Sequence, residues 1–288
     1  MSPAGRRKFS RTGAVILGAP VVAAGVAVQL PHVHARPTSA YHRLLTAVAH
    51  SSAVKSEHFS LTEAVSASGA AQKAATVKAT GEIAGSGTSA AAQMTMLVPG
   101  AGSIELRMVP PDLYARLPAA AAKQLGITKP WIAVNVDTLA KAKLGASFSQ
   151  LTSASNTWAA TLAELKAISS KVTVVGTAPV RGVPTTAYRA TVDLAKAAAG
   201  SKLTAAQLNQ LESTIGQSSL PIEVWVDHND LVRQVSYALT VHPRKQAAAV
   251  HVDSTIDLYD FGAPVSVSAP PASQVQNFTS QALSAAGG

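Results

Sequence analysis

Few residues of this 288-residue chain have the types and spacing that catalysis requires. Residues 145–149 read GASFS, one residue short of the Gly-x-Ser-x-Gly turn that exposes a nucleophilic serine, and they lie in a helical pattern rather than after a strand. Residues 85–88 read GSGT, and no Gly-Lys-Ser/Thr follows to complete a phosphate-binding loop. We therefore expect a protein without enzymatic activity.

The residues that could bind a metal are equally sparse. Residues 227–230 read DHND and bring oxygen ligands together, but the segment lacks the length and spacing of a calcium loop, so a hairpin turn is the better interpretation. No pair of histidines has the i, i+4 spacing of a helical zinc site. The histidines considered are His50, His58, His228, His242 and His251. The sequence predicts no metal site and no cofactor.

The N-terminus has the pattern of an export signal. A basic segment that includes Arg6 and Arg7 precedes an apolar stretch over residues 13–30, and the small residues before Ala35 suit a signal peptidase, so cleavage is expected after Ala35. Arg6, Arg7 and Phe9 also fit a twin-arginine signal, with the general secretory route as the alternative. An uncleaved anchor is a third interpretation, which Pro20 and several glycines weaken.

Charge and cysteine content narrow the class of protein further. The net charge is +9. Removing residues 1–35 leaves 20 basic and 15 acidic residues and a charge of +5, without the clustered charge of a nucleic-acid surface. A weak attraction to anionic envelope surfaces is compatible with this balance. The chain has no cysteine, so it has neither disulfides nor a thiol for an acyl anchor.

The remaining sequence is dominated by alternating strand patterns. Apolar residues at 94–98 and 104–108 flank the Gly-rich segment 99–102, which predicts a hairpin, and alternation returns over 222–226, 235–239 and 250–258. Shorter strands are expected near 113–117, 131–136, 172–176 and 185–192. Helical spacing predicts a first helix around residues 38–48, one or two helices over 137–166, and another over 204–216.

These patterns predict an α+β fold with a single antiparallel sheet, because strands follow one another without a βαβ alternation. A long antiparallel sheet twists and curls, so helices on its concave side could enclose an apolar space. We divide the chain into a signal peptide over 1–35, one domain over 36–268, and an Ala/Ser-rich, partly disordered tail over 269–288.

Three segments carry a resemblance to a known family: 181–194 (RGVPTTAYRATVDL), 221–227 (PIEVWVD) and 258–262 (LYDFG). Together with 113–117 (LYARL) and 129–134 (KPWIAV), their order resembles the LppX/LprAFG-like envelope lipoproteins of actinobacteria, which are LolA-like carriers. The resemblance covers residues 40–272. It implies a half-open β-barrel with helices on its concave side and a hydrophobic cavity that carries acylated lipid or glycolipid, without catalysis. The missing lipobox cysteine departs from the family pattern.

The resemblance makes the apolar strand faces candidates for the cavity lining. The candidate residues are Leu106, Met108, Val224, Val226, Tyr237, Leu239, Ile256 and Leu258. Each of them alone is equally explained as an ordinary core residue, so only their shared face is a binding hypothesis. An exported lipid carrier, in contact with an envelope membrane or a transport partner, is the first interpretation. The alternative is an exported protein-interaction or sensor module with a filled core and no ligand.

Overall fold

The computed structural model describes residues 39–67, 75–85, 90–139, 171–193, 218–241 and 249–286. Nine of the strands are β1 (Ser56–Ala67), β2 (Ala75–Ala84), β3 (Ala91–Val98), β4 (Gly102–Val109), β5 (Asp112–Arg116), β6 (Trp131–Asn135), β7 (Thr173–Val180), β8 (Val183–Asp193) and β9 (Ser219–Asp227). The others are β10 (Val232–Val241), β11 (Val250–Tyr259) and β12 (Val275–Asn277). Within the described ranges, complete helices are α1 (Ser39–Ser52), α2 (Ala119–Gln124) and α8 (Thr279–Ala286), with a 3-10 turn, η5 (Ala272–Gln274), and residues 136–139 are also helical.

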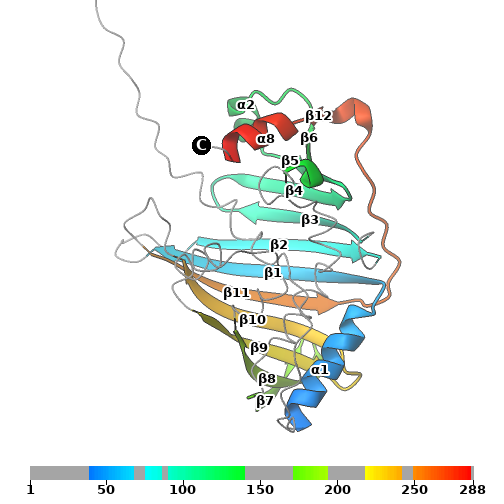
Figure 1. The fold of residues 1–288 in the computed structure, drawn as a ribbon, viewed down its shortest axis with the longest axis vertical. Coiled ribbons are helices and arrows are strands. Elements are labelled where there is room, and N and C mark those ends of the chain that lie inside the picture. Colours follow the sequence, from blue (N-terminus) through cyan, green and yellow to red (C-terminus); the bar gives the residue numbers. More distant parts are fainter. Residues whose placement is uncertain are drawn as a thin grey trace, which may run out of the picture.

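All described strands belong to one sheet, in the order β12-β6-β5-β4-β3-β2-β1-β11-β10-β9-β8-β7 (Figure 1). Two runs of sequential neighbours, β1 to β6 and β7 to β11, meet where β1 pairs with β11. Every pair is antiparallel except β12 with β6, which is parallel. The expected single, largely antiparallel sheet is therefore confirmed, with this one parallel pair as the exception.

The hairpin turns have the backbone that their residues predict. Only Arg181 and Gly182 separate β7 from β8, and both have positive φ, 48° and 82°. This is the signature of a type I′ turn, whose twist matches that of the flanking strands. Between β9 and β10, the Asp227 carboxylate accepts hydrogen bonds from the backbone N–H groups of Asn229 (2.9 Å) and Leu231 (3.0 Å). The interpretation of residues 227–230 as a hairpin turn is confirmed.

Helix α1 fits the predicted first helix and packs on the β7 to β10 end of the sheet (Figure 1). Leu44, Ala47 and Val48 recur at helical spacing and are buried, which gives α1 one apolar side. The Ser51 hydroxyl near its end accepts a hydrogen bond from the backbone N–H of Val232 at 2.8 Å. Sequence and contacts thus fix which face of the sheet α1 covers.

The described part of the C-terminal segment joins the sheet. Strand β12 pairs with β6, and α8 packs against β6. Short polar contacts hold the segment: the backbone N–H of Thr128 donates to Gln276 Oε1 at 2.9 Å, and that of Asn135 donates to Thr279 Oγ1 at 3.0 Å. Asn277 caps α8 by accepting from the N–H of Thr279.

Several expected elements lie outside the described residues. These include nearly all of the predicted helices over 137–166 and 204–216, the export-signal residues Arg6, Arg7 and Phe9, and the cleavage position Ala35. Among the helices in the described ranges, none has the length and apolar character needed to cross a bilayer.

Candidate functional site

Strand register places all eight predicted lining residues on the same side of the sheet. Directly opposed residues of neighbouring strands point to the same side of the sheet. Such partners connect Leu106 on β4, Met94 on β3, Gly81 on β2, Phe59 on β1 and Leu258 on β11. The same side continues through Ile256 to Val235 on β10 and Val224 on β9. Met108, Val226, Tyr237 and Leu239 share it because side chains alternate along a strand. We call this side the apolar face.

One half of the apolar face is a packed core under α1. Leu44 and Val48 of α1 belong to one buried cluster with residues of β8 to β11. Val224, Val226 and Leu258 are part of it, with exposed fractions of 0%, 4% and 1%. Tyr237 and Ile256 pack against its edge and are only partly buried. Three of the predicted lining residues therefore lie in a well-packed core.

The other half has a smaller buried cluster on β2 and β3. Met96 and Val98 are buried with Val77 and Ala79, and Met94 and Ile104 pack beside them. Leu106 and Met108 on β4 are only half-buried. Leu239, on the first half, is also half-buried. The predicted residues thus separate into buried core members and partly accessible members.

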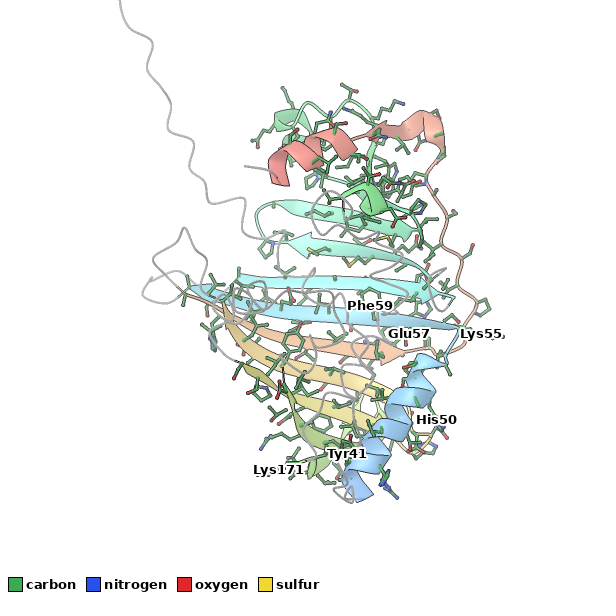
Figure 2. All side chains as sticks on the ribbon, in the orientation of Figure 1. Tyr41, His50, Lys55, Glu57, Phe59 and Lys171 are labelled. Carbon is green, nitrogen blue, oxygen red and sulfur yellow. The ribbon has the colours of Figure 1, made fainter. Side chains whose placement is uncertain are left out.

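A close approach across β2 connects the two halves. An added Cβ at Gly81 would lie 2.6 Å from the Phe59 ring and 2.3 Å from the carbonyl oxygen of Gln93. Only glycine leaves this space, so the Phe59 side chain extends across β2 toward Met94. Figure 2 shows Phe59 and Glu57 on β1, close to the point where α1 leads into the strand.

Polar side chains lie among the apolar ones on this face. Glu57 and Glu63 alternate in phase with Phe59 and Leu61, and each is only 7% exposed. Burial raises the pKa of Glu57 to about 7 and also raises the pKa of Glu63. Within the described strands the face carries no lysine, arginine or histidine to offset either carboxylate. Burial therefore disfavours the ionised form of both carboxyl groups.

Two further polar groups continue from Glu63 across the next two strands. Ser254 of β11 lies opposite Glu63, and Tyr237 of β10 lies opposite Ser254. Ser254 is 1% exposed, and its hydroxyl makes no hydrogen bond of standard geometry. Burial raises the pKa of the Tyr237 phenol, the nearby Ser254 hydroxyl lowers it in part, and the Glu63 carboxyl raises it further.

Sequence reasoning selected Tyr237 but missed Glu57, Glu63 and Ser254. Their signal was the alternation itself: residues 57, 59, 61, 63 and 65 occupy one side of a strand in which 59, 61 and 65 are apolar. A glutamate in phase with apolar residues is buried with them. Residue type alone suggests that a glutamate faces solvent, so these positions are identified only when the alternation is taken into account.

The opposite side of the sheet, which we call the polar face, pairs its charges across neighbouring strands. Arg189 bonds to Glu223 at 2.7 Å, Gln234 to Asp257 at 2.8 Å, and Arg116 to Glu105. The guanidinium groups of Arg107 and Arg116 lie 4.8 and 5.3 Å from the centre of the Trp131 ring. An open groove of about 390 Å³ lies here, with a largely polar lining that includes His58, Glu82, Gln93, Glu105, Arg107 and Tyr259.

This polar face does not assemble a metal site in the described ranges. No group of three His, Cys, Asp or Glu side chains there is placed to hold an ion. His58 contacts Glu82 at 3.2 Å and Asp260 at 3.4 Å, and His251 contacts Thr240 at 2.7 Å. The Asp227 carboxylate binds Arg233 Nε at 2.6 Å besides its turn contacts. Residues 145–149 and His242 lie outside the described residues.

Trp225 lies on the polar face, as its alternation with Val224 and Val226 predicts. Its cross-strand neighbours there are Ala187 and Gln234. The indole Nε1 is buried without a hydrogen-bond partner. Since this side chain lies opposite the apolar face, it does not line the candidate site.

Sequence comparison finds one relative of similar length but no matching family model. The relative is the uncharacterized 31.2 kDa protein of the rplA-rplJ intergenic region of Streptomyces griseus, 31% identical over 185 residues. The match covers 62% of this chain and 58% of the relative, so it spans less than two thirds of the relative's length.

Comparison with solved structures finds two mycobacterial proteins over most of their length. Lipoprotein LppX of Mycobacterium tuberculosis matches with a TM-score of 0.46 and 11% identity, over 80% of this chain and 98% of LppX. LprF of Mycobacterium bovis matches with a TM-score of 0.42 and 14% identity, over 81% of this chain and 98% of LprF. A LolA superfamily protein of Nitrosomonas europaea matches with a TM-score of 0.27 and 9% identity, over 78% of this chain and 95% of that protein. The chain is structurally similar to LppX, LprF and LolA-superfamily proteins, as its motifs predicted, and it contains no cysteine.

Proposed function

We propose that this chain is an exported, non-catalytic carrier that holds an acylated lipid or glycolipid against its apolar face. The observation that supports this most directly is the register: eight apolar residues from β4, β9, β10 and β11 share one face, and the described strands bring no basic side chain to it. A surface of this kind suits ligands whose affinity comes from apolar contact area.

The size of the face is adequate for acyl chains. From β4 to β9 the sheet crosses six strand spacings, about 29 Å at the usual separation of strands. An acyl chain in one leaflet crosses half of a hydrocarbon core that is about 30 Å thick. Each buried methylene contributes about 0.8 kcal/mol. A chain of ordinary length would therefore bind without specific polar contacts.

The packing indicates which part of the face would contact lipid. Val224, Val226 and Leu258 already fill the core under α1, so we assign lipid contact to the partly accessible Leu106, Met108, Tyr237, Leu239 and Ile256. Without a cysteine, the carrier would reach an envelope membrane or a transport partner without an acyl anchor. Movement of α1 away from the sheet would allow release.

The alternative is an exported interaction or sensor module with a filled core. The observation that favours it is the complete burial of Val224 and Val232 beneath α1, against Leu44 of that helix, which leaves that half of the face without space for a ligand. In that case the polar face, with its groove and paired charges, would carry the interaction.

Organic extraction followed by mass spectrometry tests the proposal. The protein is purified from its native envelope, and the extract is compared with that of an unrelated exported protein. Recovery of one defined acylated lipid in stoichiometric amount supports the carrier, whereas an extract no richer than the control supports the filled core. The substitution Leu106→Trp, which adds bulk to the apolar face, should reduce the lipid recovered. The matched substitution Leu97→Trp, on the polar face, should not.

A further inference from the structure

Three polar side chains form a row across the middle of the apolar face. Glu63 on β1, Ser254 on β11 and Tyr237 on β10 are directly opposed residues of neighbouring strands, and we call them the polar row. Directly opposed residues of antiparallel strands have Cβ atoms about 5 Å apart. Ser254 therefore lies between the Glu63 and Tyr237 side chains and within reach of both.

Apolar residues surround the polar row on every side that the register defines. Along the strands its neighbours on the same face are Leu61, Val65, Val252, Ile256, Val235 and Leu239. At its ends lie Val77 of β2 and Ile222 of β9. No cation in the described strands shares the face, so the carboxyl of Glu63 has no ionic partner there.

Much of the hydrogen-bonding capacity of the row is free, although the Ser254 hydroxyl lies close enough to the Tyr237 phenol to lower its pKa. Ser254 Oγ is buried and unpartnered, and no hydrogen bond of the Glu63 carboxyl occurs among the described residues. A buried polar group without a partner is destabilising, and an alanine or valine at position 254 would avoid the penalty. Such a group is explained when a ligand supplies the missing partner.

We propose that the polar row is the subsite that recognises an uncharged hydroxyl or ester group of the acylated ligand, while the surrounding apolar face holds the acyl chains. This inference rests on the proposed carrier function and adds to it the chemistry of the polar part of the ligand. A serine and a tyrosine hydroxyl each donate and accept, and the oxygens of the Glu63 carboxyl accept. The row thus matches a group that offers both an O–H and a carbonyl or ether oxygen.

The row discriminates against charged headgroups. A phosphate would lie beside a carboxyl without a lysine or arginine to neutralise it. A cationic amine would need Glu63 in its ionised form, which burial disfavours. Glu63 and Ser254 are 7% and 1% exposed, so a group bound at the row is shielded from solvent.

Competition between matched ligands tests the row. The purified full-length chain is loaded with N-phenyl-1-naphthylamine, an apolar fluorescent probe, and titrated with 1-monooleoylglycerol, 1-octadecene or oleoyl lysophosphatidic acid. The variants are Ser254→Ala and Tyr237→Phe. Ser236→Ala, which removes a hydroxyl from the polar face of β10, is the control. We expect both variants to compete about three- to tenfold less well for 1-monooleoylglycerol, the effect of one lost hydrogen bond, with 1-octadecene and the control unchanged.

The outcomes separate the row from the carrier function. Equal losses for 1-monooleoylglycerol and 1-octadecene, or no loss for either, would overturn the row and leave the carrier function standing. Stronger competition by the lysophosphatidic acid than by the monooleoylglycerol would overturn the assignment of an uncharged group. If none of the three ligands displaces the probe from the wild-type chain, both proposals are overturned.

Discussion

The two faces of this sheet use the same strands in opposite ways. On the polar face, charged groups are matched across strands, as Arg189 is with Glu223 and Arg116 with Glu105. On the apolar face, Glu63 and Ser254 are buried among aliphatic residues without hydrogen-bond partners in the described ranges. Paired charges stabilise the fold slightly, whereas buried polar groups without partners destabilise it.

Magnitudes make the contrast sharper. An exposed ion pair contributes only about 0.2–1 kcal/mol, whereas a buried unsatisfied polar group costs about 1–3 kcal/mol. The unpartnered Ser254 hydroxyl therefore costs more than one exposed ion pair of the polar face contributes, and the buried Trp225 Nε1 of the polar face carries a similar cost. Departures from the best local choice of residue are expected at functional sites, which supports a ligand-binding role for the apolar face.

The largest effect is expected from placing the same residue on either face of β3. Met96 is 6% exposed on the apolar face, and its chain neighbour Leu97 is 58% exposed on the polar face. Met96→Asp should destabilise the protein by about 4 kcal/mol or more, because it buries a carboxyl in a hydrophobic cluster. Leu97→Asp, opposite Lys78, should change stability by about 0.5 kcal/mol or less.

Chemical denaturation of the wild type and the two variants measures the difference in free energy of unfolding, provided that its dependence on denaturant has the same slope in all three. Similar losses for both variants would contradict the separation of the faces, since the two substitutions differ only in the side of the strand that they modify.

A pH-dependent effect is expected at Glu57. Its folded-state pKa, about 7, lies above the ordinary value of 4.5. Below pH 4.5 both states are protonated, and between 4.5 and 7 only the folded state keeps the proton, so stability falls as pH rises through this range. Above pH 7 the full cost, about 3 kcal/mol, has accumulated. Glu57→Gln should therefore match the wild type near pH 4 and be more stable at pH 8.

The polar face supplies the matched control. Glu82→Gln changes a half-buried glutamate of β2 that contacts His58 and Gln93, and it should give no comparable gain at pH 8. Urea denaturation at pH 4, 6 and 8 gives the three stability curves. If the free energy of unfolding of Glu57→Gln changes with pH in the same way as that of the wild type, Glu57 does not have a raised pKa in the folded state.

Sequence patterns predicted the alternating strands well because one side of most strands is mainly apolar. The hairpins at 94–108 and 222–239 and the first helix followed from spacing and turn residues alone. Pairing of β1 with β11 is a contact between distant segments that no local pattern encodes. Strand β12 was missed for the same reason: its three residues are placed by pairing with β6 and by contacts with Thr128 and Lys129 rather than by their own propensity.

The candidate site was predicted less completely than the fold. Alternation placed its eight apolar residues on one face, but it could not show that Val224, Val226 and Leu258 would be covered by α1. Glu63 and Ser254 become a unit with Tyr237 only through register, since they come from strands almost 200 residues apart in the chain.

The smallest effect is expected from an ion pair of the polar face. The guanidinium of Arg189 lies 2.7 Å from the Glu223 carboxylate, and both side chains retain solvent exposure. A double-mutant cycle with Arg189→Ala and Glu223→Ala should give a coupling energy of about 0.5 kcal/mol that decreases in 1 M salt. Salt should leave the Glu57→Gln difference nearly unchanged, because that difference arises from desolvation rather than from a neighbouring charge. A large coupling energy that does not change with salt would mean that the Arg189–Glu223 pair is shielded from solvent. The two faces would then not differ in how their charged groups are screened.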